Sequence, residues 1–379
     1  MTTHEAISLR LAAHFLSATQ ATTPEEVVSW MGAMQAQDLS HFKWAIGMRT
    51  TLPGRSHLQR SLAQGHILRL HLLRCTVQAV TPQDLPWMRE LCRERNLRTI
   101  QSWPSYNLCE QSAAFIQEGT EALREILSGG KSLHKKALCE AVASAGLPAD
   151  TAHINQLILH GEIEGTLCSG EPYGNEHTWA LASERTAPHS LHSTGSQSPQ
   201  PPTQTAALAR LATKYFRSHS PATFEDFCWW TGLTKTLCRK ALEAIATEVD
   251  EVAVAGHPMY VHHDTLRLAA QLADRADILT ASAIRPQSPT LLLPPYDEYL
   301  VGYKSRWLAI DKPFEAMAYN KFGIFRPVIL HHGRVVGNWR TSWAKDATTV
   351  QTELFTKHPT ISTQTLARAT LQLQPFCSQ

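Results

Sequence analysis

Apolar residues recur every three or four positions in the middle of the chain, and the pattern then changes to alternation. The helical spacing predicts helices from Leu133 to Ala145 and from Thr151 to Gly161. The alternation predicts strands from Ile163 to Cys168 and from Thr178 to Leu181, separated by a turn at Gly170 to Gly174. Helices followed by a β-hairpin are typical of a winged-helix module.

Helical periodicity also lies on either side of this segment, and the part after it again ends in strand-like residues, so the fold class expected is mainly α with β (α+β). Three tandem winged-helix modules are predicted, followed by a C-terminal β-rich, barrel-like domain. The expected boundaries are 1–118 and 119–185 for the first two modules, 186–205 for a flexible linker rich in Ser, Pro, Gln and Thr, 206–280 for the third module, and 281–379 for the C-terminal domain.

The C-terminal domain is expected to be β-rich because its apolar runs have the length of strands. Leu291 to Leu293 is one such run, and Phe325 to Leu330 leads through His332-Gly333 into a hairpin. Further strands are predicted for Thr349 to Leu354 and for Leu371 to Pro375.

Size and composition predict a soluble globular protein. The chain has 379 residues, of which 43% are hydrophobic and 18% charged, and this length calls for more than one core. No apolar run is long enough to cross a bilayer, and Met1 to Ile7 lacks the basic end and apolar stretch of a signal peptide. We therefore expect a cytoplasmic monomer with no membrane partner.

The eight cysteines and 19 histidines show no spacing that would hold a metal ion. No C-x-x-C pair occurs, and the doublets His262-His263 and His331-His332 place neighbours where they cannot readily share one ion. Buried free thiols, no metal and no cofactor are expected.

Net charge is only +2, but the charge is unevenly distributed. Between His41 and Ile100 the chain has ten Lys and Arg residues, opposed by Asp84, Glu90 and Glu94. A locally basic segment of this kind favours a polyanionic partner. The alternative is a helix face of solvated arginines.

Gln35-Ala36-Gln37-Asp38 combines two neutral amides and a carboxylate at the end of an apolar run. On a continuous helix residues two apart point about 200° away from each other, so the glutamines can share a site only where the chain turns. Asp38 is either a carboxylate that acts on a bound water or the N-cap of a helix from Leu39 to Met48. The glutamines themselves either line a site or solvate a helix end.

The chain resembles a family of tandem winged-helix proteins that includes the AlkZ- and YcaQ-type bacterial DNA glycosylases. The resemblance rests on four stretches: Gly32 to Asp38, Tyr215 to Thr234, Leu291 to Tyr303 and Phe325 to Trp339. It implies that the glutamine pair, here Gln35 and Gln37, positions the hydrolytic water. It also implies binding of double-stranded DNA and hydrolysis of the N-glycosidic bond of a cationic alkylated purine.

One position departs from the family pattern. Many relatives read R-G-T-L-H after the basic segment, whereas this chain reads Arg74-Cys75-Thr76-Val77-Gln78. If the missing histidine contributes to base removal, the protein binds DNA without the family's chemistry or acts on another lesion.

Together these patterns give one leading hypothesis and two alternatives. The leading hypothesis is a DNA glycosylase with Gln35, Gln37 and Asp38 as catalytic residues. Its DNA-binding residues would be Lys43, Arg69, Arg74, Thr76 and Gln78. The first alternative is a non-catalytic winged-helix DNA-binding or regulatory protein. The second is a protein-interaction scaffold, for which the Ser/Pro-rich linker is the only indication.

Overall fold

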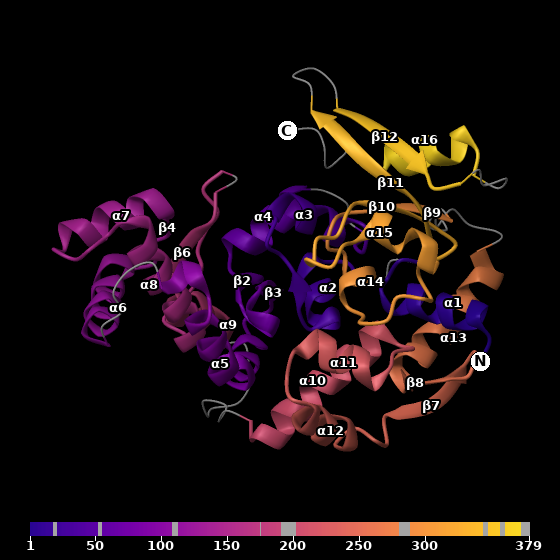
Figure 1. Cartoon of the computed structure of the whole chain (residues 1–379), viewed down its shortest axis with the longest axis horizontal. Coiled ribbons are helices and arrows are strands. Elements are labelled where there is room, and N and C mark those ends of the chain that lie inside the picture. The colour runs from indigo at the N-terminus through magenta and orange to yellow at the C-terminus, as the bar shows by residue number, and fades with distance from the viewer. Residues whose placement is uncertain are drawn as a thin grey trace. The chain divides into compact units, whose positions relative to one another are not determined.

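The computed structural model of the chain describes residues 1–17, 21–51, 55–107, 113–174, 176–190, 202–279, 289–343, 348–356 and 361–372 (Figure 1). The chain forms two compact units that are interleaved in sequence. Unit 1 comprises Met1–Met31, Asp38–His57 and Ala209–Gln379, and unit 2 comprises Gly32–Gln37 and Leu58–Leu208. The glutamine motif therefore lies at a point where the chain passes from one unit to the other.

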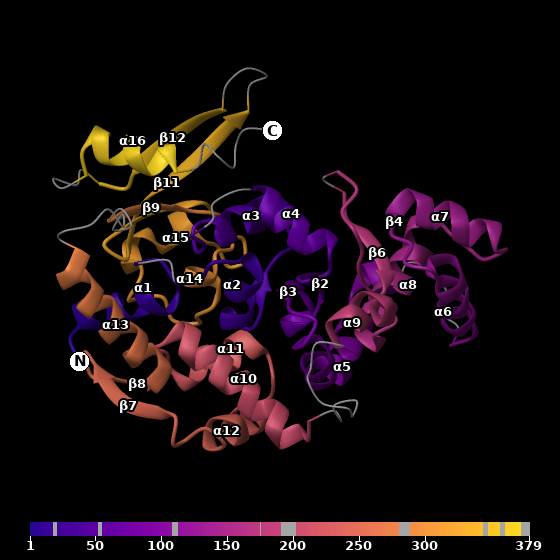
Figure 2. The ribbon, with the colours of Figure 1, turned by 180° about the vertical axis from the view of Figure 1, so that it is seen from behind.

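The second half of unit 2 has the element order predicted for a winged helix (Figures 1 and 2). Its elements are α6 (Ala113–Leu127), β4 (Leu133–His134), α7 (Lys135–Ser144), α8 (Thr151–Glu164), β5 (Leu167–Ser169), β6 (Thr178–Leu181) and α9 (Ala182–Ser190). The three strands pair antiparallel in the order β4-β6-β5. Leu123, Leu138 and Leu157, one from each of the three helices, meet in a single apolar core with Leu167.

The first half of unit 2 contains a second small sheet, which carries the glutamine motif. Its strands are β1 (Met34–Gln35), β2 (Leu68–His71) and β3 (Val77–Val80), which pair antiparallel in the order β1-β3-β2. The remaining elements of this half are α4 (Arg55–Ala63), which begins in unit 1, η1 (Leu73–Cys75), α5 (Leu85–Gln101) and η2 (Pro104–Asn107). The strand order repeats that of the neighbouring sheet, because in each a short first strand pairs with the return strand of a hairpin.

Unit 1 begins with α1 (Thr3–Ala13), α2 (Pro24–Met31) and α3 (Leu39–Gly47). Its later helices and hairpin are α10 (Gln204–His219), which begins in unit 2, α11 (Phe224–Thr231), α12 (Lys235–Glu243), β7 (Val249–Val254), β8 (His257–His262) and α13 (His263–Leu279). An isolated bridge joins Ala222 to Tyr260 of β8. Helices, bridge and hairpin again follow the predicted winged-helix order, and the module boundaries remain predictions.

The C-terminal part of unit 1 is an antiparallel sheet with helices. The strands are β9 (Thr290–Leu293), β10 (Val328–His331), β11 (Arg334–Trp343) and β12 (Thr348–Leu354), in the order β12-β11-β10-β9. The accompanying helices are α14 (Glu298–Val301), η3 (Lys312–Phe314), α15 (Glu315–Ala318) and α16 (Thr363–Leu371). The α+β fold class is thus confirmed, but the described strands form an open sheet, and not a closed barrel.

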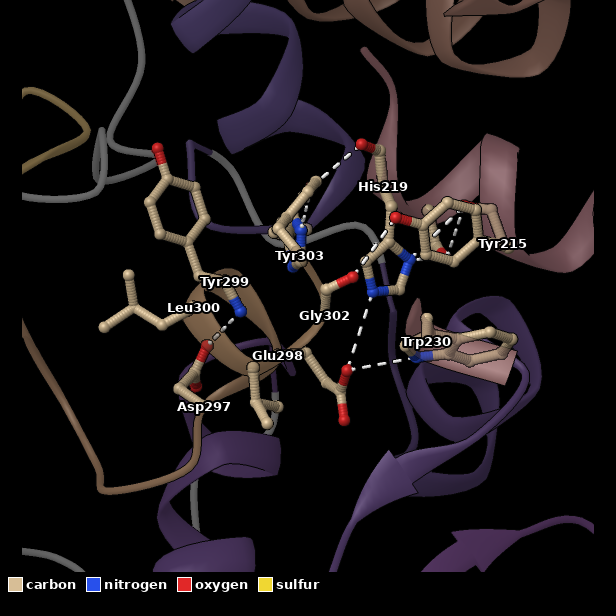
Figure 3. A network of polar contacts seen from close by, with 12 residues as sticks. Tyr215, His219, Trp230, Asp297, Glu298, Tyr299, Leu300, Gly302 and Tyr303 are labelled. Carbon is tan, nitrogen blue, oxygen red and sulfur yellow. Dashed lines mark hydrogen bonds and ion pairs between the residues drawn. The ribbon is translucent and has the colours of Figure 1, made fainter. Parts of the chain in front are cut away.

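Two of the stretches that carry the family resemblance meet in a buried polar network of unit 1 (Figure 3). The Trp230 indole N–H donates to Glu298 Oε2 at 3.3 Å, and the Tyr303 hydroxyl donates to the His219 carbonyl at 2.8 Å. The Tyr215 hydroxyl donates to the carbonyl of Gly302 at 3.1 Å. All these side chains are buried, so these stretches contribute to the core of the fold.

Local patterns predicted most elements correctly, and three element boundaries differ from the prediction. Helix α8 runs through Glu164, beyond the predicted Gly161, because Gly165 with φ 86° supplies the left-handed C-cap. The predicted linker begins inside α9, which extends to Ser190; residues 191–201 lie outside the described part. The strand predicted from Leu371 was wrong at its first residue, which ends α16, and its remainder lies outside the described residues.

Candidate active site

The glutamine motif lies at the end of a strand. Gln35 pairs with Gln78 in the ladder between β1 and β3, and the amide of Ala36 still donates to the Val77 carbonyl at 2.9 Å. Beyond Ala36 the chain bends before α3 begins. The chain thus turns at the motif, which is the condition for two glutamines at this spacing to share a site.

A hydrogen bond between the two glutamines fixes this bend. The backbone amide of Gln37 donates to Gln35 Oε1 at 2.9 Å. Ala36 between them is fully buried, Gln35 is half-buried and Gln37 is exposed. The Gln35 carboxamide is thus oriented by the backbone, whereas the Gln37 side chain is accessible to solvent.

Two more of the predicted residues lie on the neighbouring strand or just before it. Gln78 is 1% exposed, and its amide nitrogen donates to the Thr76 hydroxyl at 2.7 Å. That hydroxyl donates in turn to the Leu73 carbonyl at 3.1 Å. Since directly opposed residues of two strands share a face, Gln35 and Gln78 project to the same side of the sheet. The residue that replaces the family histidine is therefore a direct neighbour of the motif.

Arg74 occupies the turn between β2 and β3. Its φ is 55° and that of Cys75 is 54°, so two consecutive residues with side chains adopt the left-handed conformation. Such backbone is sparsely populated and persists only where the surroundings impose it. The Arg74 side chain is half-buried at this turn.

Two further predicted residues, Asp38 and Lys43, lie at the start of α3 and within it, in unit 1. Asp38 Oδ1 accepts the His41 amide at 2.9 Å, so Asp38 is the N-cap of the helix. Its side chain is 53% exposed. Lys43 is only 4% exposed, which does not fit the simple picture of a solvated phosphate contact. The N-cap alternative is confirmed for Asp38, and its catalytic role stays a prediction.

Arg69 has a position that sequence reasoning missed. It is 6% exposed, and its Nε and Nη2 both donate to the carbonyl of Ala36, at 3.0 Å and 2.6 Å. Nη2 also reaches the Gln37 carbonyl at 3.4 Å. The arginine selected as a phosphate contact is therefore bonded to the backbone of the glutamine motif. No local signal could have shown this, because its partner is a carbonyl 33 positions away.

A chain of polar side chains continues behind Arg69. Arg69 Nη1 lies 3.3 Å from Nδ1 of His177, whose ring is tilted against that of Trp179. The Trp179 indole donates to Glu162 Oε1 at 2.8 Å, and Nδ1 of His71 lies 2.6 Å from Glu162 Oε2.

Charge and burial set the protonation states of this chain. Burial and the adjacent Arg69 guanidinium lower the pKa of His177 to about 4. Burial alone would raise the pKa of Glu162, but His71 and His177 hold it below its usual value. A neutral imidazole therefore faces Arg69, while an ionised carboxylate anchors the far end.

Three arginines of the basic segment pair with carboxylates of their own unit. Arg49 is fully buried and forms a bidentate pair with Asp297, with Nη2 to Oδ1 at 2.7 Å. Arg93 donates twice to Glu164, and Arg98 pairs with Glu94 at 2.6 Å. The charge asymmetry of the sequence thus overstates the free positive charge, because two of these carboxylates come from outside the segment.

The described residues contain no cluster of His, Cys, Asp and Glu that could hold a metal ion. Among the same residues no helix is long and apolar enough to cross a membrane. The glutamine motif itself presents two carboxamides, which can orient a water molecule but are poor proton acceptors.

Comparison with known proteins identifies the family. The sequence matches the family model described as DNA glycosylase AlkZ-like over residues 28–376. The chain belongs to the AlkZ-like DNA glycosylase family. The resemblance inferred from the four sequence stretches is thereby confirmed.

Two proteins similar to this chain come from Streptomyces sahachiroi. One, called interstrand DNA cross-link repair glycosylase, is 23% identical over 338 residues, which span 87% of this chain and 85% of that protein. The solved structure of Streptomyces sahachiroi DNA glycosylase AlkZ aligns with a TM-score of 0.71 at 21% identity, covering 100% of this chain and 97% of that one. At this identity the structural likeness establishes the AlkZ-like fold.

Proposed function

We propose that this AlkZ-like protein is a monofunctional DNA glycosylase that hydrolyses the N-glycosidic bond of a cationic alkylated purine in duplex DNA. The observation that carries the proposal is the pair Gln35 and Gln37, joined at a strand end by a bond from backbone to side chain. Membership of a glycosylase family supports reading this pair as a water-positioning site.

The chemistry fits a site without an acid of its own. A purine alkylated at N7 already carries a positive charge, and it leaves as a neutral base when the bond to C1′ breaks. The sugar passes through an oxocarbenium-like state that water attacks, and the released proton goes to solvent. Two amide oxygens contribute by holding that water in line, which is catalysis by positioning. No metal or cofactor takes part in this proposal.

The predicted residues divide into roles that follow from their surroundings. Gln37 is exposed and would hold the water, while Gln35 is oriented by the Gln37 amide. Thr76 lies beside the motif, where the buried Gln78 would orient its hydroxyl, and Arg74 at the adjacent turn would contact the DNA backbone. A base reached in this way would leave the stack, unless a bulky adduct is recognised in place.

The similar protein called interstrand DNA cross-link repair glycosylase supports cross-linked DNA as a further class of substrate. Where a cross-link joins two purines through N7, the same cationic leaving group is present at each end. We propose that this chain accepts such adducts in addition to single N7-alkylpurines.

A non-catalytic DNA-binding protein is the second candidate, and one observation favours it. Gln78 occupies the position of the family histidine and cannot exchange protons near neutral pH, as an imidazole can. Under this alternative the protein binds duplex DNA and excises no base.

The deciding experiment is incubation with duplexes that contain N7-methylguanine or N3-methyladenine, scored for abasic sites. Wild type is expected to release the base, and Gln37→Ala to lower the single-turnover rate by at least about 100-fold. Duplex affinity should stay within about twofold, since positioning the water does not hold the DNA.

Gln83→Ala is the matched control, because Gln83 is an exposed glutamine of unit 2 outside the motif. It should leave both excision and binding unchanged. Binding of the duplex without excision of any adduct would select the non-catalytic protein. Absence of salt-dependent DNA affinity would select the interaction scaffold.

A further inference from the structure

We propose that Arg69 is a positioning residue: its guanidinium holds the carbonyls of Ala36 and Gln37, and thereby sets the direction of both glutamine carboxamides. The consequence for catalysis rests on the function proposed above, whereas the clamp itself can be tested without it. Arg69 does not touch the substrate in this proposal, and acts through the backbone of the motif.

The end of the strand explains why such a clamp is present. The ladder between β1 and β3 ends with the Ala36 amide, which donates to Val77 at 2.9 Å. The Ala36 carbonyl accepts two N–H groups from Arg69, at 3.0 Å and 2.6 Å. Ala36 is fully buried, and a buried carbonyl without a donor would be destabilised. A charged donor makes these bonds stronger than those between neutral groups.

The geometry requires an arginine. Nε and Nη2 converge on one oxygen, Nη2 extends to the Gln37 carbonyl at 3.4 Å, and Nη1 points to His177. A lysine ammonium is a compact point charge on a flexible stem and cannot span these acceptors in one plane. Arg69 is opposed in the ladder by Ala79, whose small side chain shares its face.

His177 supports the clamp from the other side. Its Nδ1 accepts from Arg69 Nη1 at 3.3 Å, which places the ring proton on Nε2. The groups that face His177 are Arg69, Glu162 and His71, and burial with Arg69 lowers its pKa to about 4. The imidazole is therefore neutral at physiological pH and can receive the guanidinium N–H.

The clamp matters because the glutamine turn depends on its backbone. The bond from the Gln37 amide to Gln35 Oε1 forms only if the peptide between them keeps its orientation. A shift of about 1 Å in a positioned group can lower a rate by about 100-fold. Loosening the carbonyls should therefore lower the rate of the chemical step and leave DNA affinity almost unchanged.

The kinetic test compares Arg69→Lys with wild type on a duplex containing N7-methylguanine. Excision under single turnover is expected to fall by about 10- to 100-fold. Affinity for undamaged duplex and its salt dependence should stay the same. If Arg69 instead contacts phosphate, Arg69→Gln would reduce the salt slope by about one unit and Arg69→Lys would preserve activity. Arg60→Lys, at an exposed arginine, is the control.

The structural test uses the protein without DNA. Amide hydrogen exchange of a peptide covering 34–38 should be faster in Arg69→Lys than in wild type by at least about tenfold, with α6 to α8 unchanged. Unchanged exchange at 34–38 would overturn the clamp, whatever the enzyme assay shows. If exchange at 34–38 is faster in Arg69→Lys but the wild-type protein excises no base, the clamp is supported and the glycosylase function is refuted.

A pair of variants at His177 tests the clamp even if substitution of the buried Arg69 prevents folding. His177→Leu removes the Nδ1 acceptor at a less buried position, and His177→Asn supplies an amide oxygen in its place. The clamp predicts faster exchange at 34–38 in His177→Leu and recovery in His177→Asn. Equal exchange in both would count against the role of His177.

Discussion

At the scale of single residues, Gln78 is the position beside the glutamine motif at which this chain departs from the family pattern. It opposes Gln35 in the ladder and donates to the Thr76 hydroxyl, where many relatives have a histidine. An amide can orient water but cannot transfer protons near neutral pH. We expect Gln78→His to raise the excision rate by at least about tenfold, since general acid–base groups typically contribute more than this.

The measurement is single-turnover release of N7-methylguanine across pH 5 to 8. A gain in rate with a new titration near the histidine range would support the prediction, and Gln83→His is the matched surface control. An unchanged rate would mean that the cationic leaving group needs no proton transfer, and that Gln78 is equivalent to the family histidine.

Residues of the site were predictable from sequence to the extent that their role depends on near neighbours. The glutamine pair was singled out because it lies at the end of an apolar run, and its role as a site was implied by the family resemblance. The N-cap alternative for Asp38 was foreseen because capping is a local pattern. The role of Arg69 was not foreseen, because it depends on a sheet register that brings β2 to the end of β1.

At the scale of elements, Asp38 decides how α3 begins. Its carboxylate accepts the His41 amide, and Asn is as good an N-cap as Asp. We expect Asp38→Asn to retain both stability and excision rate, and Asp38→Ala to lower the free energy of unfolding by about 1 kcal/mol. Urea unfolding and the excision assay measure the two effects.

The pair of variants separates the cap from a catalytic carboxylate. A catalytic Asp38 would lose its activity in Asp38→Asn while the helix stayed intact. If Asp38→Asn and Asp38→Ala lose the same amount of activity while Asp38→Asn keeps its stability, Asp38 acts as a catalytic carboxylate.

Elements with a sharp local boundary were predicted most closely. Strand β6 runs from Thr178 to Leu181 as expected, and the hairpin between β10 and β11 turns at His332-Gly333, both with positive φ. Whether the C-terminal strands close into a barrel could not be predicted, because closure depends on the pairing of strands that are far apart in the sequence. In the structure, β9 and β12 are the two edge strands of the open sheet that the described strands form.

At the scale of the whole molecule, the charges of the sequence acquire partners that are distant along the chain. Arg49 bonds Asp297 across 248 positions, and both side chains are buried. A count of charged residues over a stretch of sequence therefore treats Arg49 as a free positive charge, although its side chain is buried in unit 1. This is why the basic segment was a weaker indication of DNA contact than its composition suggested.

The buried histidines of unit 1 lead to a prediction about pH. His14 lies 2.8 Å from the Tyr303 hydroxyl, and its ring is 4.8 Å from that of His219. Burial, together with His219, Arg49 and Arg10, keeps the pKa of His14 well below its usual value. Burial also lowers the pKa of His219, against the pull of Glu298 at 3.6 Å. Both rings are therefore neutral in the folded protein where the unfolded chain would protonate them.

The sign of the pH effect follows from this difference. Below a pH of about 6.5 the unfolded state binds protons that the folded state does not, so stability falls as pH decreases. At pH 5.5 the loss is about 1 kcal/mol for a histidine that stays neutral when folded. Carboxylates do not account for this, because their usual pKa values lie lower.

We therefore expect the free energy of unfolding to be lower at pH 5.5 than at pH 7.5, as measured by urea denaturation. In His14→Gln this difference should shrink by about 1 kcal/mol, because one proton-linked site is removed while the hydrogen bond to Tyr303 can be kept. His4→Gln, at an exposed histidine of α1, should leave the difference unchanged. If His14→Gln had the same pH dependence as wild type, His14 would have to be charged in the fold, with Arg10 and Arg49 as its neighbours.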